Sequence, residues 1–349
     1  MIELDDTPSV FLVKKSSHSY FTSYRIFILK NLLILLFLAL ICPLLGQNIL
    51  QYRAVLLLVE PKQGNAPTEL AIRSFMQDTE QMYVLVQPDS ISTHIELAKN
   101  YRNTPTNWNF LRLHWATKPY IKALEDARQN DAPLQNAGLT HANNPEKGIS
   151  LTVDLCPSRL PLDKRVFTAL IQASNTAELP VPITLSMSGL WILTHKEDLM
   201  WLKDLASKNE LTITWANHTL HHHWSKKLPL NENFLLERGT DLTTEVLGNE
   251  ELLLKYRIQP SCFFRFPGLV SDKVITDQIL AWGLIPIGSD AWLAKGENPK
   301  ASGSIVLIHA NGNEPVGVVD FLRLLREEKT ALKRGQWRLL DLREELKKE

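Results

Sequence analysis

The chain has 349 residues, with 38 Lys and Arg against 38 Asp and Glu, so its formal net charge at pH 7 is zero. This balance argues against a nucleic-acid-binding protein, because such proteins usually carry a clear basic excess. Three cysteines exclude a disulfide-dense scaffold, and 22% charged residues with ordinary Gly and Pro contents exclude a largely disordered or fibrous chain.

The first predicted element is an apolar segment over 26–46, whose core runs without interruption from Leu32 to Ile41. About 20 mostly apolar residues span a bilayer, whereas a signal-peptide core has about 7–15. Basic residues ahead of the segment place residues 1–25 in the cytoplasm. We therefore expect a transmembrane anchor, with a cleaved signal segment and a buried core helix as the alternatives. The rest of the chain is then expected outside the cytoplasm, held at the membrane or secreted.

Residues 47–147 carry no recognisable motif and are predicted to form a small α/β segment of unknown role. Runs rich in Val and Leu predict two strands, and apolar residues at helical spacing predict two helices. The strands are 51–60 and 82–87, and the helices are 66–81 and 119–129. The polar residues 130–148 are predicted to be a linker.

From residue 148 to residue 349, short apolar strands alternate with helical stretches, a pattern typical of a parallel sheet covered by helices. The predicted strands are 149–154, 183–187, 211–217, 262–266, 284–288, 305–308 and 337–340. The predicted helices are 164–174, 196–208, 243–256, 271–282 and 318–332. Seven strands in about 200 residues favour an α/β fold of the deformed (β/α) barrel type.

Polar or titratable side chains stand at the ends of five of these strands, in chain order. They are Asp154, Asn217 with His218, Arg265, Asp290 and His309. Catalytic residues collect at the carboxyl ends of barrel strands, which all meet at one face. Taken singly, each residue is more often structural, as a capping aspartate or a buried histidine is. Their occurrence together indicates a functional site.

Four of the ten histidines lie within six consecutive positions, at His218, His221, His222 and His223. A spacing of four puts His218 and His222 on one face of a helical turn, within reach of a single transition-metal ion. The other two histidines then project elsewhere. A solvated polar turn, followed by Lys226 and Lys227, is the alternative.

Five ordered motifs resemble the polysaccharide deacetylases of carbohydrate esterase family 4, which have the NodB-homology fold. The family carries T-F-D-D-G-P, H-S/T-x-x-H, R-x-P-Y/F-G, a D-x-x-D-W-like segment and L-x-L-x-H. The counterparts here are Thr152–Pro157, His218–His222, Arg265–Gly268, Ser289–Trp292 and Leu307–Gly312. The resemblance covers about residues 149–345, and it implies a deformed barrel like the one indicated by the strands.

The resemblance implies that Asp154 is the general base and that His309 is the general acid that protonates the departing amine. Arg265 and Asp290 match the residues that orient and tune the base. A divalent ion would polarise the acetamide carbonyl and lower the pKa of water, so that a base and an acid on opposite sides of the carbon can act in turn.

The resemblance also implies that Zn²⁺ or a similar divalent ion is held by His218, His222 and a second aspartate of the first motif. That aspartate is replaced here by Leu155, which cannot ligate a metal. Hydrolytic zinc sites usually have three protein ligands. Asp154 is therefore expected to serve as the third ligand, unless the domain works without a metal or has lost catalysis.

Cys156 and Cys262 belong to the first and third motifs and are placed by the predicted strands at the barrel mouth. Outside the cytoplasm they could form a disulfide. Two buried free thiols are the equal alternative, and a Cys156 thiolate ligand in place of the lost carboxylate ranks third.

The sequence thus predicts a hydrolase that removes N-acetyl groups, in preference to O-acetyl groups, from an extracytoplasmic glycan such as peptidoglycan or an exopolysaccharide. An inactive glycan-binding module and a metal-free amidohydrolase acting on a small C–N substrate are the other readings. Four tryptophans near the site loops could stack on sugar rings, although most tryptophans are core residues. They are Trp191, Trp215, Trp224 and Trp292.

Overall fold

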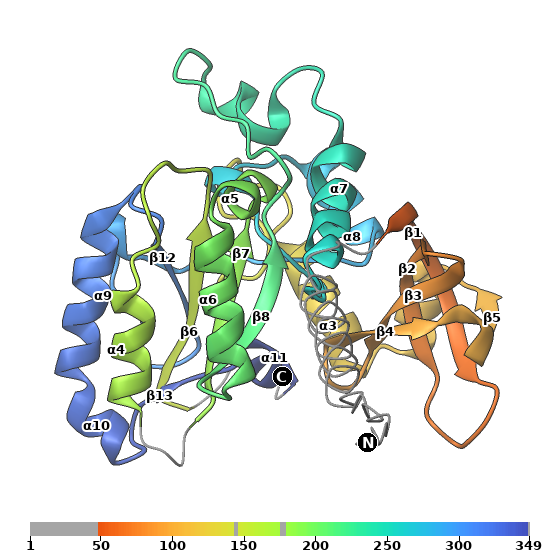
Figure 1. Cartoon of the computed structure of the whole chain (residues 1–349), viewed down its shortest axis with the longest axis horizontal. Helices are drawn as coiled ribbons and strands as arrows, with labels where there is room; N and C mark the ends of the chain where they lie inside the picture. Colours follow the sequence, from red (N-terminus) through yellow and green to blue (C-terminus); the bar gives the residue numbers. More distant parts are fainter. Residues whose placement is uncertain (1–47, 143–145, 175–178, 348–349) are drawn as a thin grey trace, which may run out of the picture. The chain divides into compact units, whose positions relative to one another are not determined.

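The computed structural model describes residues 48–142, 146–174 and 179–347 (Figure 1). Within these residues, no helix combines the length and the apolarity needed to cross a bilayer. The anchor or signal segment predicted over 26–46 lies outside the described residues.

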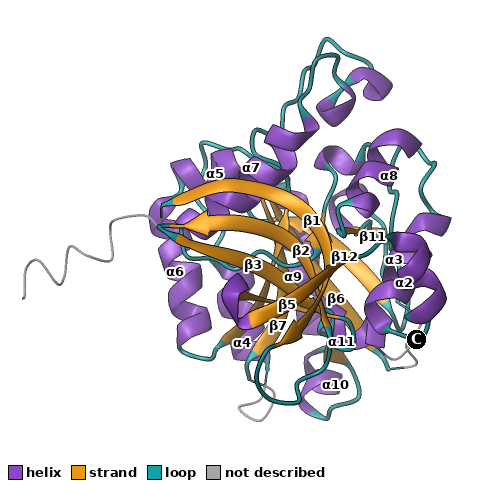
Figure 2. Ribbon diagram, turned by 90° about the vertical axis from the view of Figure 1, so that its right-hand side faces the viewer, coloured by secondary structure: helices purple, strands orange, loops and turns teal. Residues whose placement is uncertain are grey.

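The described chain begins with a five-stranded antiparallel sheet in the order β4-β3-β2-β1-β5, which Figure 2 shows face on. Its strands are β1 (Ile49–Pro61), β2 (Glu69–Gln77), β3 (Glu80–Gln87), β4 (Ser92–Leu97) and β5 (Tyr101–Pro105). Helices α2 (Trp108–His114) and α3 (Pro119–Gln129) follow. The predicted strands 51–60 and 82–87 and the predicted helix 119–129 are confirmed.

The helix predicted over 66–81 is wrong, because these residues form β2 and the start of β3. The sheet is covered on both faces, so adjacent residues of β2 are buried on opposite sides. Leu70 and Ile72 pack into the cluster shared with the barrel, while Ala71 packs against Val59 on the other face. A strand that buries apolar residues on both faces, as β2 does at Leu70, Ala71 and Ile72, lacks the alternation that distinguishes a strand from a helix.

The second sheet is parallel throughout, with seven strands in the order β10-β9-β8-β7-β6-β12-β11 and β13 added beside β6. The strands are β6 (Gly148–Leu155), β7 (Val181–Met187), β8 (Leu211–Asn217), β9 (Phe263–Phe264), β10 (Ile285–Pro286), β11 (Ala291–Trp292), β12 (Ser304–His309) and β13 (Arg338–Leu339). The sheet curls into the predicted deformed (β/α) barrel. Strand β11 was not expected from the sequence.

Helices cover the outside of the curled sheet, with α4, α6 and α9 side by side along it in Figure 1. The helices are α4 (Arg165–Ala173), α5 (Gly189–Thr194), α6 (Lys196–Ser207), α7 (Leu242–Lys255), α8 (Lys273–Ala281), α9 (Pro315–Glu327), α10 (Lys329–Lys333) and α11 (Leu342–Lys347). The main core lies between these helices and the strands, around Phe167, Trp191 and Phe321. The five predicted helices are confirmed, except that 318–332 divides into α9 and α10.

Residues 130–148 were predicted to be a linker, but the described residues 130–142 of this segment pack along the barrel instead. The amide of Leu139 donates to the carbonyl of Pro286 at 2.9 Å, next to β10, and the amide of Ala142 donates to the carbonyl of Gly303 at 2.8 Å, next to β12. The segment therefore occupies the seam between the two ends of the curled sheet. Its polar composition misled the prediction, because polar side chains such as Gln135 and Asn136 donate to barrel carbonyls, at Gly268 and Ser289, rather than to water.

The seam leaves no room for a side chain at Gly303, whose φ is +71° and whose added Cβ would lie 1.9 Å from the carbonyl oxygen of Ala142. We expect Gly303→Ala to lower the free energy of unfolding by about 3 kcal/mol, measured from urea denaturation midpoints. Gly296→Ala is the matched control, because Gly296 has a φ of +77° and open space around it. It should cost about 1 kcal/mol from backbone strain alone, and equal losses in the two variants would contradict the seam contact.

Candidate active site

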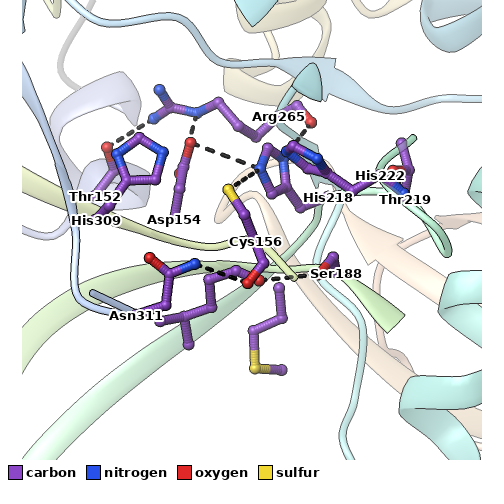
Figure 3. A network of polar contacts seen from close by, with 12 residues as sticks. Thr152, Asp154, Cys156, Ser188, His218, Thr219, His222, Arg265, His309 and Asn311 are labelled. Carbon is purple, nitrogen blue, oxygen red and sulfur yellow. Dashed lines mark hydrogen bonds and ion pairs between the residues drawn. The ribbon is translucent and has the colours of Figure 1, made fainter. Parts of the chain in front are cut away.

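The carboxyl ends of β6, β8, β9 and β12 bring four predicted residues together, as Figure 3 shows. Asp154 is paired in register with His309 of β12. Its Oδ1 lies 3.8 Å from Nε of Arg265, and its Oδ2 lies 3.8 Å from Nε2 of His218. Arg265 also donates from Nη2 to Oγ1 of Thr152 at 2.6 Å. The side chains of Asp154, His218 and Arg265 are almost completely shielded from solvent.

Cys156, His218 and His222 form a group whose ligand atoms all lie within 4.8 Å of one another. The thiol sulfur of Cys156 is 3.5 Å from Nε2 of His218, and Nε2 of His222 is buried with no hydrogen-bond partner. One thiolate and two imidazoles are ligands that Zn²⁺ accepts, with a fourth position left open in hydrolytic sites. These residues therefore fit a divalent ion. Asp154, the third ligand expected from the sequence, stands beside this group.

His218 is oriented as a metal ligand requires. Its Nδ1 lies 2.9 Å from the carbonyl oxygen of Arg265, and because a carbonyl only accepts, Nδ1 carries the proton. The lone pair of Nε2 then faces Cys156 and Asp154. Burial lowers the pKa of His218 below its ordinary value, although the neighbouring Asp154 opposes this, so the imidazole stays neutral.

Basic side chains around Asp154 and Cys156 lower the pKa of both acidic groups below their ordinary values. Burial alone would raise the pKa of Asp154, but Arg265, His218 and His309 hold it below the ordinary value. Burial likewise opposes ionisation of Cys156, while His222 and His309 lower the pKa of its thiol to about 7. A carboxylate free to accept a proton and a thiolate free to bind a metal are therefore both present near neutral pH.

The two histidines meet through a loop rather than through the helical turn that the sequence suggested. Thr219 and His222 have φ angles of +66° and +49°, in the left-handed region. The amide of His222 donates to Oγ1 of Thr219 at 3.2 Å, and the imidazole centroids of His218 and His222 are 4.6 Å apart. The pairing of His218 and His222 predicted from their i, i+4 spacing is therefore present, but a loop with left-handed residues produces it instead of a helical turn.

Glu314 completes the surroundings of His309 and was missed in the sequence. Its Oε2 lies 2.8 Å from Nδ1 of His309 and accepts from the indole Nε1 of Trp292 at 2.7 Å. Burial opposes protonation of His309, but Cys156, Glu314 and Asp154 raise its pKa well above the ordinary value. The sequence does contain a signal for Glu314. It is a carboxylate five residues after a strand-end histidine and directly before the proline that begins α9.

The prediction that Asp290 orients Arg265 is wrong. Asp290 lies directly before β11, at the amino end of the parallel sheet and so opposite the site. Its Oδ2 contacts Nδ1 of His141 at 2.7 Å and Oγ of Ser304 at 3.2 Å, which ties the seam segment to β12. The error follows from the unrecognised β11, because without it Asp290 reads as the end of the preceding strand.

Of the two equal alternatives for Cys156 and Cys262, the disulfide is wrong and the pair of buried free thiols is confirmed. Cys262 precedes β9, whereas Cys156 follows β6, so the two lie at opposite ends of parallel strands. Burial raises the pKa of Cys262 to about 12, which makes it an inert core thiol. Leu155 packs into the core beneath the helices, so Cys156, on the side of Asp154, is the residue that reaches the histidines.

A cavity of about 370 Å³ lies under the loop that carries the histidine cluster. Phe234 lines it and also meets the ring of His222 edge-on at 5.8 Å, so the cavity borders the site. His221 and His223 line it as well, each paired with a glutamate, and neither joins the candidate ligands. The cavity is a place where a substrate chain could extend from the site.

The four tryptophans named from the sequence divide between core and surface. Trp191 is completely buried and Trp215 packs partly buried against the main core. Trp292 lies against His309, with ring centroids 5.8 Å apart. Trp224, at 53% exposure, is the one of the four that presents a large open face to solvent.

A family model described as the RP012 protein N-terminal domain matches residues 51–120. Solved structures similar to this chain include a family 4 carbohydrate esterase from Bacillus anthracis, at 19% identity and a TM-score of 0.43 over 64% of this chain and 92% of that one. PdaA, a family 4 carbohydrate esterase from Bacillus subtilis, gives 16% identity and 0.43 over 64% and 89%. A CE4 family pseudoenzyme from Bacillus anthracis gives 17% and 0.38 over 61% and 70%.

The thiol of Cys156 should decide whether the group binds a metal. We expect Cys156→Ala to weaken binding of Zn²⁺ or Co²⁺ by at least about 100-fold, because one of three ligands is lost. Affinity is measured by titration against a competing chelator. Cys262→Ala is the matched control, since it removes an equally buried thiol from the core. Equal affinity in the wild type and Cys156→Ala would show that the thiol is not a ligand.

Proposed function

We propose that this chain is a metal-dependent hydrolase that removes N-acetyl groups from an extracytoplasmic glycan. The observation that carries the proposal is the placement of Asp154 and His309 in register on neighbouring strands, beside the Cys156, His218 and His222 group. The surroundings lower the pKa of the Asp154 carboxyl and raise that of the His309 imidazole. A general base has to be deprotonated and a general acid protonated before they can act in turn, and the opposite pKa shifts of these two groups favour those states.

A divalent ion held by the thiolate and the two imidazoles would polarise the acetamide carbonyl. Asp154 then accepts a proton from the attacking water, and the cation of Arg265 keeps that carboxylate ionised and aimed. His309, held by Glu314, donates its proton to the departing nitrogen, so that acetate and a free amine leave. Together these transfers balance the hydrolysis of one C–N bond by one water.

The proposed substrate is a polymer, such as peptidoglycan or an exopolysaccharide, rather than a free sugar. The cavity beside His222 and the exposed face of Trp224 extend the site along the loop above it. An extracytoplasmic glycan matches the apolar segment over 26–46, which we propose holds the barrel at the outer face of a membrane.

Release of acetate from N-acetylated glycans tests this function directly. We expect acetate from peptidoglycan or N-acetylglucosamine oligomers, lost on treatment with a chelator and restored by Zn²⁺ or Co²⁺. Asp154→Asn should lower the rate by about 10²–10⁴-fold, because the base is removed. Asp204→Asn on α6, an exposed carboxylate paired with Lys208, is the control. Chelator-insensitive release would point to a metal-free amidohydrolase, and glycan binding without release would point to a binding module.

Glu314 should set the alkaline limb of the pH profile. His309 must be protonated to act as an acid, and its raised pKa keeps that form present to higher pH. Glu314→Gln removes one cause of the raised pKa, so the fall of kcat with rising pH should begin at lower pH. Trp292→Phe, which removes only the indole N–H on Glu314, should shift this limb less. An unchanged limb in Glu314→Gln would exclude the carboxylate from this role.

A further inference from the structure

The N-terminal sheet reaches the site through one buried ion pair. Arg73 of β2 contacts Glu250 of α7, with Nε 2.6 Å from Oε2 and Nη2 donating to Oε1 at 3.0 Å. Its Nη1 donates to the carbonyls of Ile72 and Trp282 at 2.8 and 2.6 Å. The hydroxyl of Tyr52 in β1 donates to the same carboxylate at 2.9 Å. Both charged side chains are almost completely buried, at 1% and 2% exposure.

Glu250 in turn contacts Asn217, the residue directly before the first histidine of the candidate metal group. Nδ2 of Asn217 lies 3.4 Å from Oε1 of Glu250 and 2.8 Å from the carbonyl oxygen of Val246. Because both of these neighbours are acceptors, the NH₂ end of the amide must face them. Oδ1 of Asn217 is thereby turned toward the backbone amide of Thr219, which donates to it at 2.9 Å.

The contact to Thr219 holds a backbone conformation that is unfavourable by itself. A β-branched residue with a φ of +66° pays a steric cost and persists only where its surroundings impose it. The hydroxyl oxygen of Thr219 accepts a hydrogen bond from the backbone amide of His222, so the conformation of this turn sets the positions of both imidazoles. A reversed Asn217 amide would set an NH₂ group against the Thr219 N–H and release the turn.

We propose that Arg73 is a positioning residue for the site, acting through Glu250 and Asn217 on the turn that carries His218 and His222. A buried ion pair adds little net stability, since an apolar pair of similar volume is often as stable or more so. Its value here is orientation, because the carboxylate kept in place by Arg73 is a second acceptor, beside the Val246 carbonyl, on the NH₂ side of Asn217. The Oδ1 side accepts from the Thr219 amide and from Nδ2 of Asn249 at 2.8 Å. This gives the N-terminal sheet a role in the chemistry of the barrel.

The test separates positioning from stability with the full chain carrying Arg73→Met and Glu250→Leu together, which replaces the ion pair by an apolar pair. We expect a urea midpoint close to that of the wild type. Amide hydrogen exchange over residues 217–222, measured without metal, should nevertheless be about 10-fold faster or more. Binding of Co²⁺ should weaken by about 10–100-fold, as for other changes behind metal ligands.

Tyr120→Phe is the matched control. Its hydroxyl donates to the carbonyl of Gly283 at 2.6 Å, so it removes an equally buried contact between the N-terminal part and the barrel that does not lead to Asn217. It should leave exchange over 217–222 and Co²⁺ affinity as in the wild type. Wild-type exchange and affinity in a folded double variant would overturn the proposal.

If the double variant does not fold, Arg73→Lys takes its place, because it keeps the charge and loses the fork that engages both carboxylate oxygens. It should also speed exchange over 217–222, and an unchanged rate there contradicts the proposal. Of the two measurements for the positioning role of Arg73, only the Co²⁺ affinity depends on the proposed function. If the wild type binds no Co²⁺, the proposed function fails, whereas the exchange measurement in metal-free protein still decides on Arg73.

Discussion

The negative charge of a carboxylate buried away from water has to be compensated by nearby basic groups. At Asp154 this requirement determines the arrangement of the whole site. A single carboxylate in a low-dielectric interior would normally take up a proton. Here the guanidinium of Arg265, itself fully buried, prevents this, and the imidazoles of His218 and His309 add to the effect. Each of these three groups follows or ends a different strand. The barrel therefore has to close before the charge is stable, and once closed it holds a base and an acid in opposite states.

The parallel sheet explains why much of this was predictable. A short, mostly apolar run followed by strongly polar residues marks a strand and its carboxyl end, and parallel strands put all such ends on one face. Asp154, His218, Arg265 and His309 follow this rule, and the structure brings them together. Asp290 breaks it, because β11 is two residues long and too short to be read as a strand. The residue directly before β11 was therefore taken for the end of the preceding strand.

Other features depend on contacts that no local pattern contains. The role of Cys156 depends on which side chain of the first motif turns toward the histidines, and Leu155 instead fills the core. Glu314 faces His309 because α9 begins beneath Trp292, which is a tertiary arrangement. The residues 66–81 were misread since their apolar positions serve two cores at once. In each case the missing information was the identity of the neighbour, not the character of the residue.

The segment along the seam has a consequence for how this fold can be inherited. Residues 130–142 bond to the ends of the curled sheet at Pro286 and Gly303, and they belong to the part of the chain that precedes the barrel. Cutting the chain at Gly148 would uncover the edges of β10 and β12, and exposed edges invite pairing with other chains. The barrel is thus not a portable unit. Gene fusions that move it between proteins would have to carry at least residues 130–142 with it, so this segment and the barrel should travel through evolution as one.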